Sequence, residues 1–312
     1  MPADLNMPTT NTKGPPDSTR PRVLVIGEAL IDIVERDGTS TEHVGGSPAN
    51  VALTLARLGR DATLVTDIAD DAHGRRISGH LSASGVEVLR GDSERTSIAR
   101  AMIREDGSAE YEFDFSWNPP AADASSAVHV HTGSIAIYLE PGGSEVLDLL
   151  EALPPGVTAS VDANIRPAVI GEHHDALARF ERIAAACEIV KLSDEDAEWL
   201  YPRMQLDEVL TRLISLGAQL AVVTRGSRGL IIASAIARAT VPAARIVVAD
   251  TIGAGDSAMG AILDEAFRQG LGIPGGMRLD EPSLWAIGQW AVRIAGITTS
   301  RSGANPPSHT EL

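Results

Sequence analysis

The sequence predicts an α/β fold in which helices cover both faces of a mostly parallel central sheet, with a smaller second β-sheet beside it. Two observations favour this fold. From residue 22 onward, short apolar runs rich in β-branched residues alternate with segments of helical periodicity. One stretch interrupts the alternation, because residues 96–104 and 109–117 flank Glu105-Asp106-Gly107-Ser108, and Asp-Gly between two strand-like runs is a hairpin signal.

The expected strands of the central sheet are short and apolar. The first run, Arg22-Val23-Leu24-Val25-Ile26-Gly27, is continuously apolar after its arginine, which is typical of a strand covered on both faces. Six further runs are expected to be strands: residues 62–66, 127–131, 158–161, 188–192, 220–224 and 246–249. Since helical segments separate most of these runs, parallel pairing is expected.

Seven segments between the strands are expected to be helices. Residues 48–58 begin with a proline and end just before Gly59, which are typical helix boundaries. Within this segment, Val51 and Leu55 lie at helical spacing. The other expected helices are residues 72–84, 144–152, 175–186, 206–216, 254–268 and 282–298.

The small sheet is expected to draw on residues 31–45 and 96–117. Within the first range, residues 31–35 and 43–45 look like strands that pair with the predicted hairpin. A small sheet inserted into an α/β body is suited to act as a lid over a substrate cleft. The alternative is an ordinary extra hairpin on the body.

The two ends of the chain are expected to be tails around one domain. Residues 1–21 are rich in Pro, Thr, Asn and Asp and lack periodicity, which predicts a disordered segment. Residues 22–307 form the predicted domain, and residues 308–312 a short tail. Lys13 and Arg20 are followed by no apolar core of a secretory signal, and no apolar run approaches the ~18 residues of a membrane span.

Charge and cysteine content narrow the choice of partners and compartment. The formal net charge of -16 disfavours nucleic acid and anionic membranes as partners. The single cysteine, Cys187, cannot form an internal disulfide, and its apolar surroundings in the sequence predict a buried residue. A reducing, cytoplasmic compartment is therefore expected.

The strongest chemical motif is Asp250-Thr251-Ile252-Gly253-Ala254-Gly255-Asp256-Ser257, which opens an apolar helix. Small residues let the backbone approach a ligand, and the N–H groups of Gly253, Ala254 and Gly255 can form an anion hole for developing phosphate charge. Asp256 beside that hole is suited to take a proton from an attacking hydroxyl. The alternative is a plain glycine-rich turn with Asp256 as a helix cap.

A second motif, Gly45-Gly46-Ser47-Pro48-Ala49-Asn50-Val51-Ala52, opens an earlier helix. Gly45 and Gly46 provide a tight backbone against which a ligand can lie. Asn50 offers a donor and an acceptor, which suits a sugar hydroxyl. The alternative is that Asn50 only caps or crosslinks its own loop.

These two motifs, in this order and far apart in the chain, resemble the signatures of the ribokinase-like (phosphofructokinase-B) carbohydrate kinase family. The resemblance covers residues 23–307. It implies a three-layer α/β/α sandwich with a β-sheet lid, and ATP-dependent transfer of phosphate to a sugar hydroxyl. It also implies Mg²⁺ with the nucleotide, and K⁺ as a further, more weakly indicated cofactor.

Further positions match the family one by one. Gly27-Glu28-Ala29-Leu30-Ile31-Asp32 is similar to its first strand and turn, which implies that Asp32 binds sugar hydroxyls. The stretch Asp162-Ala163-Asn164-Ile165-Arg166 resembles a substrate segment that often reads Asp-Pro-Asn-x-Arg, with Ala163 in place of proline. Asn164 and Arg166 are thereby implied to meet substrate or phosphate; a surface ion pair of Arg166 is the alternative.

The nucleotide and cation residues follow from the same resemblance. Ser193 and Asp196 occupy the family's Asn-x-x-Glu positions, which implies nucleotide contact for Ser193 and a water-mediated Mg²⁺ role for Asp196. A helix cap with an acidic first turn is the compatible alternative. The remaining implied contacts are Thr224, Gly226, Gly229 and Thr251 with ATP, and Asp250, beside residues 301–304, with a monovalent cation.

The substrate is predicted to be fructose, with fructose 6-phosphate as the product, because these motifs look most like the fructokinase branch. Ribokinase, 2-keto-3-deoxygluconate kinase and nucleoside kinase remain alternatives. A non-catalytic sugar or nucleotide sensor is the rival of another class, although it would be expected to lack the base. Residues 111–117 of the lid are expected to touch the sugar or to form a homodimer contact.

Two further features argue against other functions. An NAD-dependent oxidoreductase would show Gly-x-Gly-x-x-Gly after the first strand, and Gly27-Glu28-Ala29-Leu30 does not. His129 and His131 share one strand face, but no third metal ligand lies at the usual spacing. These histidines are expected to be structural or to lie at the edge of the substrate site.

Overall fold

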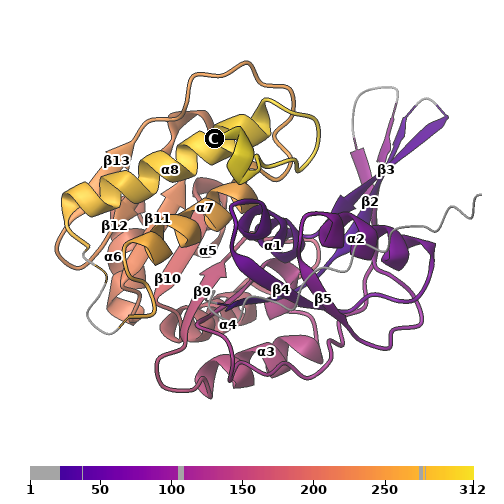
Figure 1. Cartoon of the computed structure of the whole chain (residues 1–312), viewed down its shortest axis with the longest axis horizontal. Helices are drawn as coiled ribbons and strands as arrows, with labels where there is room; N and C mark the ends of the chain where they lie inside the picture. The colour runs from indigo at the N-terminus through magenta and orange to yellow at the C-terminus, as the bar shows by residue number, and fades with distance from the viewer. Residues whose placement is uncertain (1–21, 37, 105–108, 274–276, 278) are drawn as a thin grey trace, which may run out of the picture.

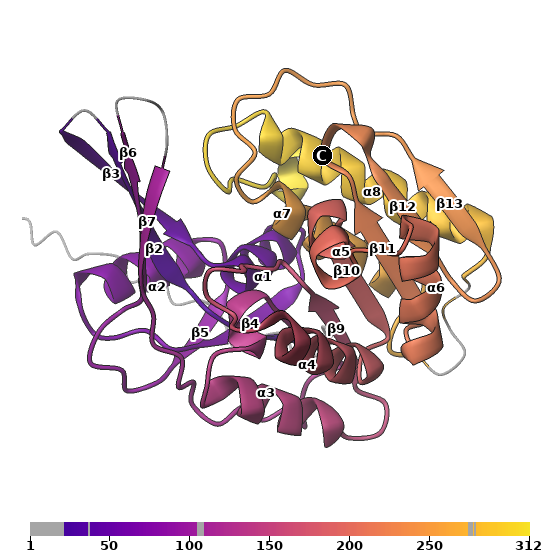
Figure 2. The same cartoon turned by 180° about the vertical axis from the view of Figure 1, so that it is seen from behind.

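The structure, a computed structural model, describes residues 22–36, 38–104, 109–273, 277 and 279–312. Its described strands form two separate sheets, and helices cover both faces of the larger one (Figures 1 and 2). The predicted tail, residues 1–21, and the predicted hairpin turn, residues 105–108, lie outside the described residues. Within the described ranges, no helix combines the length and the apolar character needed to cross a membrane.

The larger sheet has the order β13-β12-β11-β10-β9-β8-β1-β4-β5. Its pairs are parallel from β5 to β11, whereas β11-β12 and β12-β13 are antiparallel. The strands are β1 (Arg22–Ile26), β4 (Asp61–Thr66), β5 (Glu87–Arg90), β8 (His129–Gly133), β9 (Thr158–Asp162), β10 (Ile189–Ser193), β11 (Leu220–Thr224), β12 (Leu230–Ala233) and β13 (Arg238–Val241). The mostly parallel sheet is confirmed.

Alternate residues of each strand face opposite helical layers. In β1, Val23 and Val25 belong to one buried cluster and Leu24 and Ile26 to the other. The first layer holds α1 (Ser47–Arg57), α2 (Ala72–Ala83), α7 (Ala254–Arg268) and α8 (Glu281–Thr299). The second holds α3 (Gly142–Glu151), α4 (His173–Ala185), α5 (Asp194–Leu200) and α6 (Leu206–Leu216), with the 3₁₀ helix η1 (Ser134–Ile137).

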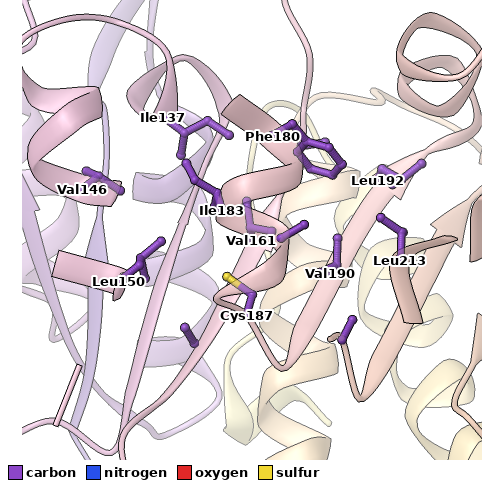
Figure 3. Close-up of a cluster of buried hydrophobic side chains, with 14 of the residues drawn as sticks. Ile137, Val146, Leu150, Val161, Phe180, Ile183, Cys187, Val190, Leu192 and Leu213 are labelled. Carbon is purple, nitrogen blue, oxygen red and sulfur yellow. The ribbon is translucent and has the colours of Figure 1, made fainter. Parts of the chain in front are cut away.

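The second layer packs through apolar side chains of its helices and of the sheet. Figure 3 shows Phe180 and Ile183 of α4 above Val161 and Val190 of the strands β9 and β10. Cys187 lies among them, buried and free, as its sequence context predicts. Burial raises the pKa of its thiol, so Cys187 is a packing residue rather than a reactive one.

The smaller sheet stands beside the larger one and has the order β3-β2-β6-β7. Its strands are β2 (Leu30–Arg36), β3 (Thr39–Gly45), β6 (Ile98–Ile103) and β7 (Ala109–Asp114). β2 pairs with β6 in parallel and with β3 in antiparallel orientation. The predicted lid is therefore a separate sheet, not an extra hairpin on the body.

Asp67, buried just after β4, ties the connections of the β6–β7 hairpin of this lid to the body. Its carboxylate accepts hydrogen bonds from the hydroxyls of Ser93 and Ser116, at 2.5 and 3.1 Å, and from the N–H of Asn118 at 2.9 Å. Ser93 precedes β6 and Ser116 follows β7. One carboxylate thus anchors the two chain segments that lead into β6 and out of β7.

Several elements differ from the prediction. The strand expected at 246–249 is wrong: Ile246 and Val247 are exposed, and the N–H of Ala249 donates to Thr299 O of α8 at 2.9 Å instead of to a strand. β5, β12 and β13 are not among the predicted elements, and α5 was expected only as the alternative reading of Ser193 and Asp196 as a helix cap. Residues 308–312, expected to be a tail, contain the 3₁₀ helix η3 (His309–Glu311), and Leu312 packs against the buried cluster of Leu58, Ala261 and Ile294.

Candidate active site

The predicted site residues gather where the parallel strands end. β9, β10 and β11 finish at Asp162, Ser193 and Thr224. The first turn of α7 lies beside them, since a side-chain carbon built on Gly255 would be 3.7 Å from Lys191 Nζ of β10. Ligands of open parallel sheets bind outside the carboxyl ends of the strands, so this edge is the candidate active site.

α7 begins with a glycine in the left-handed conformation. Gly253 is the N-cap, with φ 72° and ψ 3°. Ala254 donates its N–H to Thr251 O at 3.2 Å, which closes the turn before the helix. The N–H groups of Gly255 and Asp256 belong to those that a helix start leaves without an internal acceptor. Of the three predicted anion-hole groups, that of Ala254 is therefore partly engaged.

Asp256 lies in this first turn, 9% exposed, and both of its carboxylate oxygens are held. Ser47 donates its hydroxyl to Oδ1 at 2.7 Å, and Asn50 donates its side-chain amide to Oδ2 at 2.8 Å. Each carboxylate oxygen has a second lone pair. Asp256 is thus oriented by α1 and can still accept a proton.

Beneath the start of α7, Lys191 and Asp162 form a buried ion pair. Lys191 Nζ lies 2.9 and 2.7 Å from the two carboxylate oxygens, and the side chains are 4% and 1% exposed. Burial raises the pKa of Asp162 to about 6, although the ammonium of Lys191 opposes this rise. The pair brings a positive charge close to Gly255, where an anion would meet the helix start.

His129 and His131 are buried on the same sheet face. His129 bonds Thr158 and Ser160 through its two ring nitrogens, both at 2.7 Å, and His131 Nδ1 lies 2.9 Å from Ser160 Oγ. Burial lowers the pKa of both imidazoles, so they are neutral. Their partners are hydroxyls of β9, as expected of structural histidines.

Asp32 projects from β2 of the lid over the glycines that precede α1. A side-chain carbon on Gly45 would fall 2.0 Å from Asp32 Oδ2, and one on Gly46 would fall 2.4 Å from Glu28 O. Both glycines are therefore required by close packing. Burial raises the pKa of Asp32 to about 6, while Arg166 and His43 lower it and Asp256 raises it. Asp32 and Asp256 thus face the same space.

The segment after β9 brings Arg166 to this space as well. Asn164 has a φ of 37°, in the left-handed region, and Arg166 donates to Ile165 O at 2.9 Å. The charge of Arg166 lowers the pKa of Asp32 and of Glu28. Among the described residues, Arg166 forms no ion pair within 4.0 Å, so its guanidinium is not used as a surface ion pair there.

Ser193 and Asp196 form the capping box of α5. Ser193 Oγ accepts from Asp196 N at 2.9 Å, and Asp196 Oδ2 accepts from Ser193 N at 2.8 Å. Asp196 Oδ1 accepts from Ile165 N at 2.7 Å, so this residue also anchors the segment that carries Arg166. The predicted cap is present, and a water-mediated role of Asp196 toward Mg²⁺ stays a prediction.

Thr224 ends β11, and Gly226 and Gly229 lie in the turn between β11 and β12. Gly226 is exposed with a φ of 52°, and a side-chain carbon there would meet no atom within 4 Å. Gly229 is buried, and a side-chain carbon there would lie 2.0 Å from Val241 O. Gly229 is therefore explained by the packing of β13, whereas Gly226 leaves room for a ligand.

Asp250 joins the loop before α7 to the segment after α8. Its carboxylate accepts from Ile252 N at 3.0 Å and from Gly303 N at 2.8 Å. Although burial raises the pKa of Asp250, these backbone bonds and one from Thr251 hold it below the usual value. The two segments expected around a monovalent cation are thus adjacent.

A groove of about 690 Å³ beside α8 was not predicted. It lies between residues 242–246 and α8, and its lining is mainly apolar. The residues that line it include Pro242, Ala244, Ile246, Ala286, Val292 and Ile297. Residues 242–246 lie a few positions before Asp250 and Gly253 in the chain, so the segment that lines the groove also leads to the start of α7.

Three residues near the site carry no predicted role: Ser47, Lys191 and Glu28. Ser47 stands inside the motif with Asn50, and Glu28 stands four positions before Asp32. For Ser47 and Glu28, their positions within or beside these motifs were the sequence signal that could have identified them as site residues. Lys191 could be recognised only from strand pairing, because its partner Asp162 lies on the neighbouring β9.

Gly253→Ala is expected to lower kcat by about two orders of magnitude, as small misplacements of reacting groups do. An alanine would have to adopt a φ of 72°, and its Cβ would lie 2.5 Å from Ala304 Cβ, so the first turn of α7 must shift. Steady-state kinetics test this. Gly85→Ala is the matched control, with φ 94° and no atom within 4 Å of the added carbon; it should lose stability but keep kcat. An unchanged kcat for Gly253→Ala would contradict the role of this helix start.

Comparison with protein families finds a match to the pfkB family carbohydrate kinase over residues 20–311. The chain is 34% identical over 257 residues to a fructokinase of Rhizobium leguminosarum bv. trifolii, covering 77% of this chain and 78% of the relative. The family match includes both glycine-rich motifs and the strands between them.

Solved structures share the fold. Fructokinase with bound ATP from Xylella fastidiosa superposes with a TM-score of 0.81 at 24% identity, covering 91% of this chain and 93% of that one. Fructokinase from Vibrio cholerae O395 in a fructose, ADP and calcium ion bound form has a TM-score of 0.76 at 24% identity, covering 92% and 95%. The similarity extends over both sheets.

Proposed function

Since the chain belongs to the pfkB family of carbohydrate kinases, we propose that it transfers the γ-phosphoryl group of ATP to a hydroxyl of fructose. The products would be fructose 6-phosphate and ADP. The observation that carries the reaction type is Asp256, buried at the start of α7 and oriented by Ser47 and Asn50. The choice of fructose is supported by the names of the relative and of the solved structures that the chain resembles.

The sugar would lie between the lid and the main sheet. Asp32 and Asn164 would bind its hydroxyls against Gly45 and Gly46. Asp256 would take the proton of the attacking hydroxyl as the new O–P bond forms and the bond to the ADP oxygen breaks, with no covalent enzyme intermediate.

Negative charge on the transferred phosphoryl group would be stabilised by the start of α7 and by two cationic side chains. Backbone N–H groups of Gly253 and Gly255 would face the phosphoryl oxygens. Lys191, beside Gly255, and Arg166, near Asp32, would supply positive charge. These groups are fixed before the reaction, so they need little reorganisation as charge develops.

ATP would extend from the helix start toward the groove beside α8. The apolar lining of that groove suits a planar base. Gly226, Thr224, Ser193 and Thr251 would contact the ribose and phosphates, whereas Gly229 would support the turn from below.

Mg²⁺ would neutralise nucleotide phosphate charge. Both oxygens of Asp196 already accept backbone N–H groups, which leaves lone pairs for metal-bound water but disfavours direct ligation. Asp250, with the Ile252 carbonyl, would hold K⁺. Asp250 presents its carboxylate between two backbone segments, which fits a cation held mainly by carbonyl oxygens.

The proposal also includes an expected cellular location and an expected oligomeric state. A cytoplasmic location fits the use of ATP and the single thiol Cys187. A homodimer through the lid is supported by Phe113 of β7, which is 38% exposed and packs on Phe115. Sedimentation of the full chain would test the second point, since a monomer at micromolar concentration would contradict it.

A substrate panel tests the function. ADP release would be measured with ATP and Mg²⁺ and with fructose, ribose, 2-keto-3-deoxygluconate or adenosine. We expect turnover with fructose and product phosphorylated on its terminal hydroxyl. ADP release with only another of these compounds would exclude fructose as the substrate but keep the kinase chemistry. No ADP release with any of the four would favour a non-catalytic sensor.

The kcat/KM for the sugar is expected to rise as pH is raised through about 6. Burial raises the pKa of Asp32 to about 6, so its carboxylate, which accepts sugar hydroxyls, is lost as pH falls below that value. Asp32→Asn should remove this rise in the pH profile of kcat/KM. It should also lower kcat/KM roughly 10- to 100-fold, the effect of losing a charged hydrogen bond. The KM for ATP should stay unchanged, and an Asp32→Asn variant that retains this rise would contradict the assignment.

A further inference from the structure

Glu28 is a buried carboxyl group beside the site that the proposed transfer does not use. It lies between β1 and β2, where the chain leaves the main sheet and enters the lid. Only 5% of the residue is exposed. Glu28 Oε1 accepts from Ser47 N and Oε2 from Ala136 N, both at 3.3 Å. Both oxygens are therefore engaged by the backbone of other segments.

The bond to Ser47 supplies a cap that α1 lacks. Its N-cap, Gly46, has no side chain, and no acidic residue lies in its first turn. N–H groups at a helix start carry partial positive charge and need an acceptor. Glu28 provides one from 19 positions away and so fixes the first turn of α1.

Side chains at the start of α1 position Asp256, the proposed base. Ser47 is bonded through its N–H to Glu28 and through its hydroxyl, at 2.7 Å, to Asp256 Oδ1. One turn later, Asn50 donates to Asp256 Oδ2 at 2.8 Å. We propose that Glu28 is a positioning residue for phosphoryl transfer, which fixes α1 so that Ser47 and Asn50 present Asp256 to the sugar hydroxyl. This inference rests on the proposed function of Asp256 as the base.

The burial of Glu28 favours a role other than stability. Burial raises its pKa from 4.5 to about 7, against the backbone bonds, the Ser134 hydroxyl and the charge of Arg166, which lower it. Between those values the unfolded chain is ionised while the folded chain keeps the proton, so folding stability falls as pH rises from 4.5 to 7. Groups that reduce stability in this way are typical of functional sites.

Glu28→Gln tests the proposal, because an amide keeps the shape but has one acceptor oxygen for two N–H groups. We expect kcat to fall roughly 10- to 100-fold, as for other small misplacements of a catalytic group. The KM values for fructose and ATP should stay unchanged. Glu188→Gln is the matched control, since Glu188 also accepts a backbone N–H, from Ala159 at 2.6 Å, but lies at the opposite end of β10. It should leave kcat unchanged.

A double variant shows whether Glu28 acts through the base. In the Asp256→Asn background, Glu28→Gln should lower the residual turnover by no more than about twofold, because coupled residues are not additive. The inference would be overturned if Glu28→Gln lowered the residual turnover of Asp256→Asn by as large a factor as it lowers the wild-type kcat. A wild-type kcat for Glu28→Gln alone would also overturn it. If Asp256→Asn itself keeps wild-type kcat, the base assignment fails and the inference falls with it.

Ser47→Ala decides the matter if Glu28→Gln does not fold. It keeps the N–H that Glu28 accepts and removes only the hydroxyl bonded to Asp256. We expect kcat to fall about tenfold, the effect of one hydrogen bond to a charged group. An unchanged kcat in folded Ser47→Ala would contradict the proposed path from Glu28 to the base.

Discussion

Asp256→Asn is expected to lower kcat by about 10³-fold, within the range that a general base contributes. The variant should fold, because Ser47 Oγ can accept from the new amide while the remaining oxygen accepts from Asn50. Only proton removal is then lost, so the KM values for fructose and ATP should change little. Steady-state kinetics, with single turnovers at high enzyme concentration for the residual rate, provide the measurement.

Asp264→Asn is the matched control, because Asp264 is also buried on α7. It is held by Arg60 at 2.7 Å, Trp290 at 2.9 Å and Arg268 at 2.8 Å, away from the first turn. The control should lose stability but keep kcat. The base assignment would be wrong if Asp256→Asn kept a kcat close to that of this control.

Lys191→Met is expected to destabilise the protein by about 3–5 kcal/mol, because it leaves the buried carboxylate of Asp162 without its cation. Both partners are at most 4% exposed, so water cannot replace the ammonium. Thermal or urea unfolding would measure the loss. Since Lys191 Nζ also lies beside Gly255, kcat should fall in the folded variant as well.

Two further variants separate the effect of Lys191→Met on stability from its effect on kcat. Arg182→Met removes an exposed ion pair with Glu151, whose side chains are 61% and 46% exposed, and should cost less than about 1 kcal/mol. The double variant Lys191→Met with Asp162→Asn should regain most of the stability but not kcat. Equal losses in Lys191→Met and Arg182→Met would show that the buried pair does not support the fold.

Local patterns were sufficient for much of the fold. Arg22–Ile26 and Leu220–Thr224 are strands as their apolar runs predict, and Ala254–Arg268 is a helix with the expected bounds. The run at 246–249 has similar composition, but the N–H of Ala249 is bonded to the end of α8 and not to a strand. Composition predicts a preference for extended structure, whereas a strand also needs a free sheet edge.

The sequence by itself determined the fold class, the family and the position of Asp256 at a glycine-rich helix start, because each follows from local patterns and motifs that can be recognised along the chain. Only the tertiary structure decided that Asn50 bonds Asp256 across 206 positions, that Lys191 pairs with Asp162, and that Glu28 caps α1. These contacts arise from strand register and helix packing. A single sequence contains the partners but not their distances, so the orientation of the base becomes visible only when α1 and α7 are packed together.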